Sequence, residues 1–320
     1  MSVRSWLPVL FFPVLLLPGC LNIEPLVVGH VSEVIVERSP RWIEFNRIAI
    51  IDIDGFISNE KPSWYGGSGT TVADVKEKLR RAENDSFVKA VLLRINSPGG
   101  EVTASDMLYQ EVLTFKGRSG KPVVAVVMGL GASGAYYVAC AADHIVVAPT
   151  GVTGSVGVVM HFLNVQGLFG KIGLSTGVVK SGEKKDIASP TRAMTEEERA
   201  LLQEINNAMF ARFEAVVRAN RPRMTDEAWA VIRDGRIFVG EQALELHLVD
   251  TVGYMSDALD VALRLADISA ADVILYRAFP HYNTNIYAGS DGDRWQMTRA
   301  LDMLLKRHGA AFLYVWSPGL

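Results

Sequence analysis

A serine at a glycine-rich junction is the residue of this chain best suited to chemistry. Ser133 follows the apolar run 123–128 and lies between Gly131 and Gly134. The small and aromatic residues that come next, 135–142, predict a helix that begins directly after the serine. The first turn of a helix leaves backbone N–H groups unpaired, and such donors can stabilise the oxyanion that forms when a hydroxyl attacks a carbonyl. The junction therefore predicts an acyl-transfer site, with Ser133 as a nucleophile that still needs a base.

Histidine, the commonest base for such a serine, has no good candidate. The G-x-S-x-G pattern of many hydrolases is broken at Ala135. The six histidines are scattered, and none lies in a polar loop of catalytic character. We expect surface or structural roles for residues His30, His144, His161, His247, His281 and His308.

A lysine can replace the histidine if its amine is neutral. The pKa of the amine must then fall by about three units from its usual ~10.4, which burial and neighbouring positive charge both favour. Lys180, Lys184 and Lys185 form such a group in and beside the polar loop 181–194. A lysine-rich loop is more often a solvated surface, so spacing alone leaves both interpretations open.

A second glycine turn could complete the site. Ser97-Pro98-Gly99-Gly100 directly follows the predicted strand 89–95, and glycines let a backbone approach a ligand closely. Its N–H groups could supply a second oxyanion donor beside Gly134.

The elements that must position these residues alternate between strand and helix. Apolar, β-branched runs predict buried strands, and amphipathic segments between them predict helices. This order favours an α/β fold in layers with a mostly parallel sheet and flanking helices. We expect strands over 47–53, 89–95, 123–128, 143–147, 156–160, 174–180 and 237–239. We expect helices over 71–82, 103–116, 135–142, 225–234, 256–266 and 294–307, and a long helix from the capping box Thr195–Glu198 to Pro222.

The first twenty residues predict export. An apolar stretch of 12 residues, 6–17, follows Arg4; it is shorter than the ~20 residues of a membrane-spanning helix and suits a secretory signal. The following Leu17-Pro18-Gly19-Cys20 resembles a bacterial lipobox, which implies a lipidated Cys20 and an extracytoplasmic protein tethered to a membrane. An uncleaved short anchor is the alternative. Cys140 would then be the remaining thiol, and we expect it to be buried in a helix.

Composition excludes several classes of function. The chain has 320 residues, 49% of them hydrophobic, and a net charge of −3, which is ordinary for a globular protein. The charge gives no reason to expect nucleic acid as a partner. Since the His and Cys spacings typical of metal sites are absent from the sequence, we expect no metal or other cofactor.

Four motifs, in this order, resemble one family. They are RINSPGGEV (94–102), GLGASGAYYVACAAD (129–143), PTGVTGSVGVV (149–159) and KSGEKKDIASPTRAMTEEE (180–198). Together they resemble the signal peptide peptidase A family, the Ser–Lys peptidases with the Clp protease/crotonase fold, over about residues 45–265. A later segment, FVGEQALELHLVDTVG, is also similar, with His247 where the family has glycine.

The resemblance assigns a role to each residue that matches the family motifs. It implies that Ser133 is the nucleophile, Lys185 the general base and Ser155 the residue that orients the lysine amine. It also implies that the N–H groups of Gly100 and Gly134 hold the oxyanion.

Lys184 competes with Lys185 for the role of base. The family places the base directly before an Asp-Ile-x-Ser-Pro run, which is residues 186–190 here, so the resemblance favours Lys185.

The resemblance also implies a substrate and an assembly. The family hydrolyses hydrophobic peptides such as cleaved signal peptides, and its short form builds homo-oligomeric rings in which Ser and Lys can come from neighbouring subunits. A crotonase-like acyl-CoA enzyme and a non-catalytic lipoprotein scaffold are the alternatives. We divide the chain into a signal peptide (1–19), a linker and edge segment (20–44), a peptidase domain (45–268) and a C-terminal extension (269–320).

Overall fold

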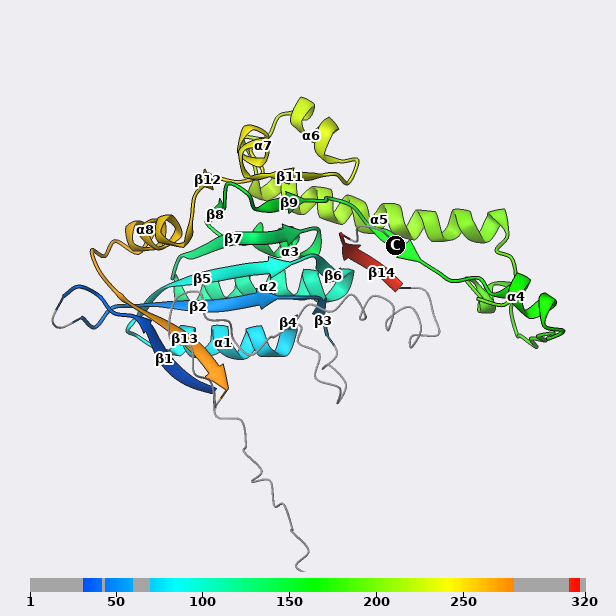
Figure 1. Ribbon diagram of the computed structural model, residues 1–320, viewed down its shortest axis with the longest axis horizontal. Coiled ribbons are helices and arrows are strands. Elements are labelled where there is room, and N and C mark those ends of the chain that lie inside the picture. Colours follow the sequence, from blue (N-terminus) through cyan, green and yellow to red (C-terminus); the bar gives the residue numbers. More distant parts are fainter. Residues whose placement is uncertain (1–30, 42–43, 60–69, 279–310, 317–320) are drawn as a thin grey trace, which may run out of the picture.

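A mostly parallel sheet forms the centre of the protein. The computed structural model describes residues 31–41, 44–59, 70–278 and 311–316, and within them a nine-stranded sheet has the order β1-β13-β2-β5-β7-β8-β12, with β9 beside β7 and β11 beside β9 (Figure 1). Only the pairs β1–β13 and β11–β9 of this sheet are antiparallel. The strands are β1 (Val31–Glu37), β2 (Arg47–Asp54), β5 (Val88–Ser97), β7 (Val123–Ala132), β8 (His144–Val147), β9 (Val152–Gly154), β11 (Ile237–Val239), β12 (Thr251–Val252) and β13 (Asp272–Ala278).

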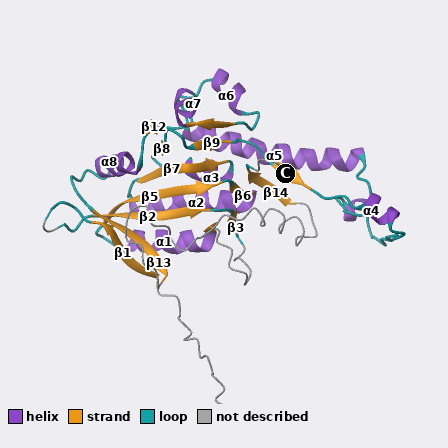
Figure 2. Ribbon diagram, in the orientation of Figure 1, coloured by secondary structure: helices purple, strands orange, loops and turns teal. Residues whose placement is uncertain are grey.

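Helices cover both faces of this sheet. On β2, Ile51 and Ile53 join the hydrophobic cluster under α1 (Val72–Asn84) and α2 (Val102–Ser119), while Ile48 and Ile50 join the cluster under α8 (Met255–Leu265). Successive side chains of a strand point to opposite faces, so a strand buried on both sides is apolar throughout. This layered arrangement, visible in Figure 2, confirms the expected α/β fold class.

A smaller sheet stands at the carboxyl ends of the central strands. Its strand order is β10-β14-β6-β3-β4, and it joins segments that are far apart in the sequence. The strands are β3 (Ile57–Ser58), β4 (Thr70–Thr71), β6 (Gly99–Glu101), β10 (Val159–His161) and β14 (Ala311–Val315). The apolar segment at the end of the chain is therefore a strand of this sheet, although β13 and β14 both come from the segment assigned to an extension.

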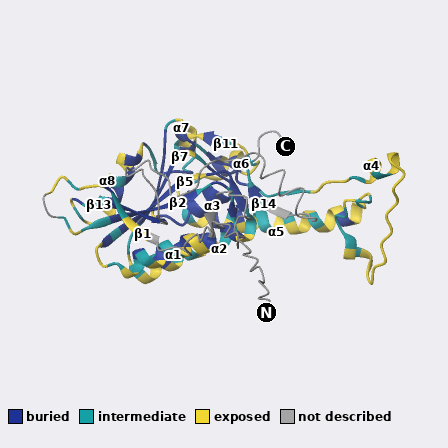
Figure 3. Ribbon diagram, turned by 60° about the horizontal axis from the view of Figure 1, so that its bottom comes forward, coloured by how far each residue is buried: buried dark blue, intermediate teal, exposed yellow. Residues whose placement is uncertain are grey.

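A long helix carries an arm away from the two sheets. α5 (Glu196–Asn220) begins at a capping box formed by Thr195 and Glu198, as predicted, and buries Phe213, Val216 and Val217 near its other end. Residues 162–195, here called the arm, contain α4 (Gln166–Lys171) and the short 3-10 helix η1 (Glu183–Asp186). The arm extends beyond the body in Figure 1 and is largely exposed in Figure 3.

Two local predictions were wrong. The strand expected over 174–180 does not form, because these residues are exposed on the arm and no strand of the described part of the chain lies beside them. The central strand does not end at residue 128, as expected; it continues to Ala132 because Leu130–Ala132 pair with β9. Cys140 is fully buried at the end of α3 (Gly134–Ala139), as expected. The helix predicted over 294–307 lies outside the described residues.

His247 occupies a backbone position that favours glycine. It follows α7 (Gly240–Glu245) with φ of 57°. Its N–H donates to the carbonyl of Leu244, and the N–H of Leu248 donates to the carbonyl of Ala243. This pair of bonds is the Schellman motif, which places a left-handed residue after the helix. The motif gives a physical reason to expect glycine at this position.

We predict that His247→Gly stabilises the protein. A non-glycine residue in the left-handed region costs roughly 1–2 kcal/mol, and the greater freedom of glycine in the unfolded chain offsets about 0.5–1 kcal/mol of this. Urea denaturation should show a free energy of unfolding higher by about 0.5 kcal/mol. The matched control is Gly120→Ala: Gly120 follows α2 with φ of 67°, and no atom lies within 4 Å of an added Cβ. That substitution should lower the free energy of unfolding, and a shift of both variants in the same direction would contradict the explanation.

Candidate active site

Ser133 lies in a strained turn between β7 and α3. Its φ and ψ are 55° and −116°, at the N-cap of the helix, and it is 1% exposed. Its N–H donates to the carbonyl of Gly154 at 2.7 Å, and its carbonyl accepts from the N–H of Tyr137 at 2.9 Å. A non-glycine residue adopts such a conformation only when its surroundings hold it there. Within the described residues, the hydroxyl makes no hydrogen bond and is available as a nucleophile.

Two glycine segments meet beside this serine. Gly99 has φ of 98°, and a Cβ on it would lie 2.6 Å from the nitrogen of Gly134. A Cβ on Gly134 would lie 3.1 Å from the nitrogen of Gly100 and 2.4 Å from Oγ of Ser105. Only glycine allows backbones to approach this closely. The structure therefore brings together the two N–H groups, of Gly100 and Gly134, that the sequence predicted as oxyanion donors.

β14, the last described strand, lies beside the two glycine segments. Tyr314 of β14 pairs antiparallel with Gly100 of β6, and the N–H of Trp316 donates to the carbonyl of Pro98 at 2.9 Å. Hydrogen-bonded and non-bonded pairs alternate along an antiparallel ladder, so Gly100 and Tyr314 form the next hydrogen-bonded pair. The carbonyl oxygen of Tyr314 also lies 3.1 Å from where a Cβ on Gly134 would be. A backbone carbonyl thus occupies the place between the two N–H groups.

Aromatic packing holds this strand and the serine helix together. The fully buried ring of Tyr314 lies 5.3 Å from the ring of Tyr137 on α3 and 4.7 Å from that of Phe213 on α5. Its hydroxyl donates to the carbonyl of Met209 at 2.8 Å. Burial and the hydrogen bond to Asp106 raise the pKa of Tyr137 well above its usual value. These phenols therefore act as neutral packing groups rather than as acids or bases.

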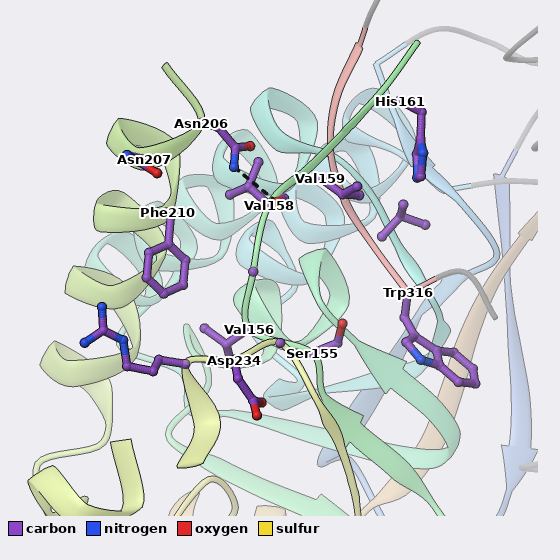
Figure 4. Close-up of a pocket in the computed structure, with 14 residues that line it drawn as sticks. Ser155, Val156, Val158, Val159, His161, Asn206, Asn207, Phe210, Asp234 and Trp316 are labelled. Carbon is purple, nitrogen blue, oxygen red and sulfur yellow. Dashed lines mark hydrogen bonds between the residues drawn. The ribbon is translucent and has the colours of Figure 1, made fainter. Parts of the chain in front are cut away.

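Ser155 lies at the floor of an open pocket. It is 7% exposed with φ of 51°, and its N–H donates to the carbonyl of Arg236 at 2.8 Å. The pocket has a volume of about 430 Å³. In Figure 4, Asn206 and Phe210 of α5 line one side, and Trp316 lies on the other. Neither Ser133 nor a lysine belongs to its lining.

The predicted base lies apart from both serines within one chain. Lys185 is exposed on η1 of the arm, and no hydrogen bond in the described part of the chain joins it to Ser133 or Ser155. The structure thus brings Ser133, Gly100 and Gly134 together and leaves Lys185 on the projecting arm.

The two candidate lysines differ in their surroundings. Lys184 forms an ion pair with Glu197 at 2.5 Å, and this hydrogen bond raises the pKa of the Lys184 amine. A raised pKa is the opposite of what a general base needs. The amine of Lys185 has no ion pair or hydrogen bond with the described residues. Its surroundings therefore favour Lys185 over Lys184.

Sequence reasoning missed the contribution of β14 to this site. The run 311–316 is visibly apolar, but its pairing with Gly99–Glu101 spans more than two hundred residues and has no local signal. Ser105, whose Oγ lies against Gly134, was also missed, because this contact depends on how α2 packs against α3.

Comparison with known proteins gives the family of the chain. Residues 116–269 match the family described as Peptidase family S49, and residues 66–150 match the one described as Clp protease. "Putative protease slr0021" of Synechocystis sp. is 36% identical over 229 residues, which cover 72% of this chain and 78% of the relative.

Two further relatives agree. "Putative protease MJ0651" of Methanocaldococcus jannaschii is 42% identical over 61% of this chain and 61% of its own length. "Putative signal peptide peptidase SppA" of Enterococcus faecium is 35% identical over 70% of this chain and 64% of its own length. The chain thus spans less than two thirds of these two relatives. The resemblance stated from the four motifs is confirmed: the chain belongs to peptidase family S49.

Proposed function

We propose that this protein is a serine endopeptidase in which Ser133 attacks the peptide carbonyl and Lys185 is the general base. The observation that carries the proposal is the convergence of the Gly100 and Gly134 N–H groups beside a strained Ser133, whose hydroxyl makes no hydrogen bond within the described residues. Preorganised donors at the position of a developing oxyanion are usually the largest contribution to acyl transfer. Membership in family S49 and relatives named as proteases support the same reaction class.

In the proposed mechanism, the amine of Lys185 acts both as the general base and as the general acid. Neutral Lys185 takes the proton of Ser133 as the serine oxygen bonds to the substrate carbonyl carbon, and the N–H groups of Gly100 and Gly134 hold the resulting oxyanion. The protonated amine then gives its proton to the leaving nitrogen as the C–N bond breaks. Water, deprotonated by the same amine, hydrolyses the acyl-enzyme, and the proton returns to Ser133. Ser155 accepts or donates a hydrogen bond that orients the amine.

Lys185 must lose its contact with water to act as the general base. Burial of an amine lowers its pKa and so favours the neutral form that a base requires. We infer that Lys185 is buried against another copy of this chain. The open pocket beside Ser155 has room for a lysine side chain, and insertion there would bring the amine to the hydroxyl that the family motif assigns to it.

Apolar side chains on the arm support this assembly. Six of them are more than half exposed, and they fall within seventeen residues that include α4 and precede η1. They are Leu163, Leu168, Ile172, Leu174, Val178 and Val179. Exposed apolar surface of this extent is typical of protein contacts. An arm that docks on the body of the next copy makes a head-to-tail interface, and such an interface builds a ring when the rotation between copies closes.

The second sheet indicates how a peptide binds. β14 fills the position between β6 and β10, so this position accepts an extended chain. A peptide substrate would take the place of β14 there, with main-chain hydrogen bonds giving affinity and side-chain pockets giving specificity. The buried ring of Tyr314 packs against the rings of Tyr137 and Phe213. We propose hydrophobic peptides as substrates, including signal peptides after their removal from secreted proteins.

We also propose that the chain is anchored to a membrane outside the cytoplasm by a lipid on Cys20. The support is the apolar stretch and lipobox-like sequence of residues 6–20, which lie outside the described residues. No helix in the described part of the chain is both long and apolar enough to span a bilayer. Mass spectrometry of the mature amino terminus tests the anchor, and an unmodified Cys20 would refute it.

Substitution of the dyad tests the reaction. We expect Ser133→Ala and Lys185→Ala each to lower kcat for an apolar peptide by at least about 10³-fold, because each removes a group that moves the proton. Lys184→Ala should stay within about twofold of the wild type, since its amine pairs with Glu197. Size-exclusion chromatography and circular dichroism would show that all variants remain folded and assembled. An active Ser133→Ala protein, or an inactive Lys184→Ala with an active Lys185→Ala, would refute the assignment.

Removal of β14 tests whether the substrate peptide binds at the position of this strand. A chain that ends at residue 310 loses the strand whose carbonyl faces the N–H of Gly100, so we expect the KM for an apolar peptide to fall several-fold. The same truncation removes the Tyr314 ring and should cost about 3–5 kcal/mol of stability, so folding is checked by circular dichroism. The matched control ends at residue 316 and keeps the strand, and its KM should equal that of the full chain. An unchanged or higher KM in the folded shorter protein would contradict this geometry.

A further inference from the structure

A network of ion pairs on the arm surrounds the turn that bears Lys185. The guanidinium of Arg192 donates through Nε to Oδ2 of Asp186 at 2.8 Å and through Nη2 to Oδ1 at 2.9 Å. Nη2 also donates to the backbone carbonyl of Asp186 at 3.1 Å. Nζ of Lys180 donates to Oδ1 of the same carboxylate at 2.6 Å and to the carbonyl of Glu183 at 2.8 Å. Asp186 is thus held by three charged donor atoms directly after the proposed base.

The same arginine reaches the first turn of α5. Its Nη1 donates to Oε2 of Glu198 at 2.8 Å, and its Nη2 contacts Oε1. Glu198 is 2% exposed, although most of the surrounding arm is exposed. Its Oε2 also accepts from the backbone N–H of Thr195 in the capping box at 3.0 Å. Arg192 and this N–H hold the pKa of Glu198 at about 2, so the carboxylate stays ionised at neutral pH.

These contacts form a continuous path from the core to Lys185. The far end of α5 is anchored by buried Phe213, Val216 and Val217. Arg192 joins the exposed end of that helix to η1, whose backbone is closed by the N–H of Lys185 donating to the carbonyl of Gly182 at 3.1 Å. The turn after η1 contains Ala188 in the left-handed region, with φ of 61°. A strained turn on an otherwise solvated arm needs such fixed contacts to keep one conformation.

We propose that Arg192 is a positioning residue: it fastens the η1 turn to the end of α5 and so fixes where the Lys185 amine is presented. This inference rests on the proposed function. An arginine suits the task because its planar fork binds two carboxylates with several parallel hydrogen bonds, which a lysine cannot do. Misplacement of a reacting group by about 1 Å costs on the order of 10²-fold in rate. The effect of losing Arg192 should therefore appear in kcat, not in peptide binding.

The test compares Arg192→Ala with wild type in the full-length assembled protein, using an apolar peptide. We expect kcat to fall by about 30- to 100-fold while KM changes less than about threefold. Guanidinium ion at low millimolar concentration should restore part of the lost activity, and Arg192→Lys should be intermediate. Arg199→Ala is the matched control: Arg199 is an exposed arginine one residue beyond Glu198, and we expect wild-type kinetics.

A double-mutant cycle separates positioning from a general structural effect. If Arg192 acts through Asp186, the double variant Arg192→Ala/Asp186→Asn should lose no more activity than the more damaging single variant. The proposal is overturned if kcat of Arg192→Ala stays within twofold of the wild type, if the two losses multiply, or if Arg192→Ala no longer assembles. An inactive Lys185→Ala protein beside a fully active Arg192→Ala protein would refute this inference alone, whereas an active Lys185→Ala protein would refute the proposed function.

Discussion

A lysine can act as a base only after its amine has been taken out of water, and this constraint governs the whole protein. Ser133 and its two N–H donors are buried and complete within one chain. The proposed base instead stands on a projecting arm with no partner among the described residues. The free energy needed to keep an amine neutral must therefore come from a second surface that covers it. The open pocket beside Ser155 and the apolar side chains of the arm are complementary features that such a surface would use.

The serine half of the site depends on backbone geometry rather than on side chains. β5 and β7 are adjacent parallel strands, so the turns at their carboxyl ends meet at one edge of the sheet. The glycines at 99, 100 and 134 let these turns approach until a single methyl group would collide with a neighbouring nitrogen or oxygen. The strain at Ser133 is held by β9 on one side and α3 on the other. The two N–H donors are thus held in fixed positions beside Ser133.

Local patterns were enough to predict the central strands, most helices and the serine junction. Apolar β-branched runs such as 47–53 have one stable place in an α/β protein, between two helical layers. The capping box at Thr195 is also local, and it formed as predicted. Pairings between distant segments carry no local signal and could not be predicted. Examples are β14, which pairs with Gly100 of β6, and β9, which pairs with the end of β7. The run 174–180 has the composition of a strand, but the described part of the chain places no strand beside it, so composition alone gave a wrong prediction there. His247 was noticed as a departure from glycine, and its φ supplies the reason.

Mixing of inactive subunits tests most directly whether the base comes from another copy of the chain. Ser133→Ala subunits retain Lys185, and Lys185→Ala subunits retain Ser133. In a ring of head-to-tail contacts, random co-assembly of equal amounts pairs an intact serine with an intact lysine at about one site in four. The account predicts that co-refolded mixtures regain roughly a quarter of the wild-type peptidase activity, while each variant alone stays inactive. Co-assembled mixtures with no activity would contradict it, because a dyad confined to one chain cannot be restored by a neighbour.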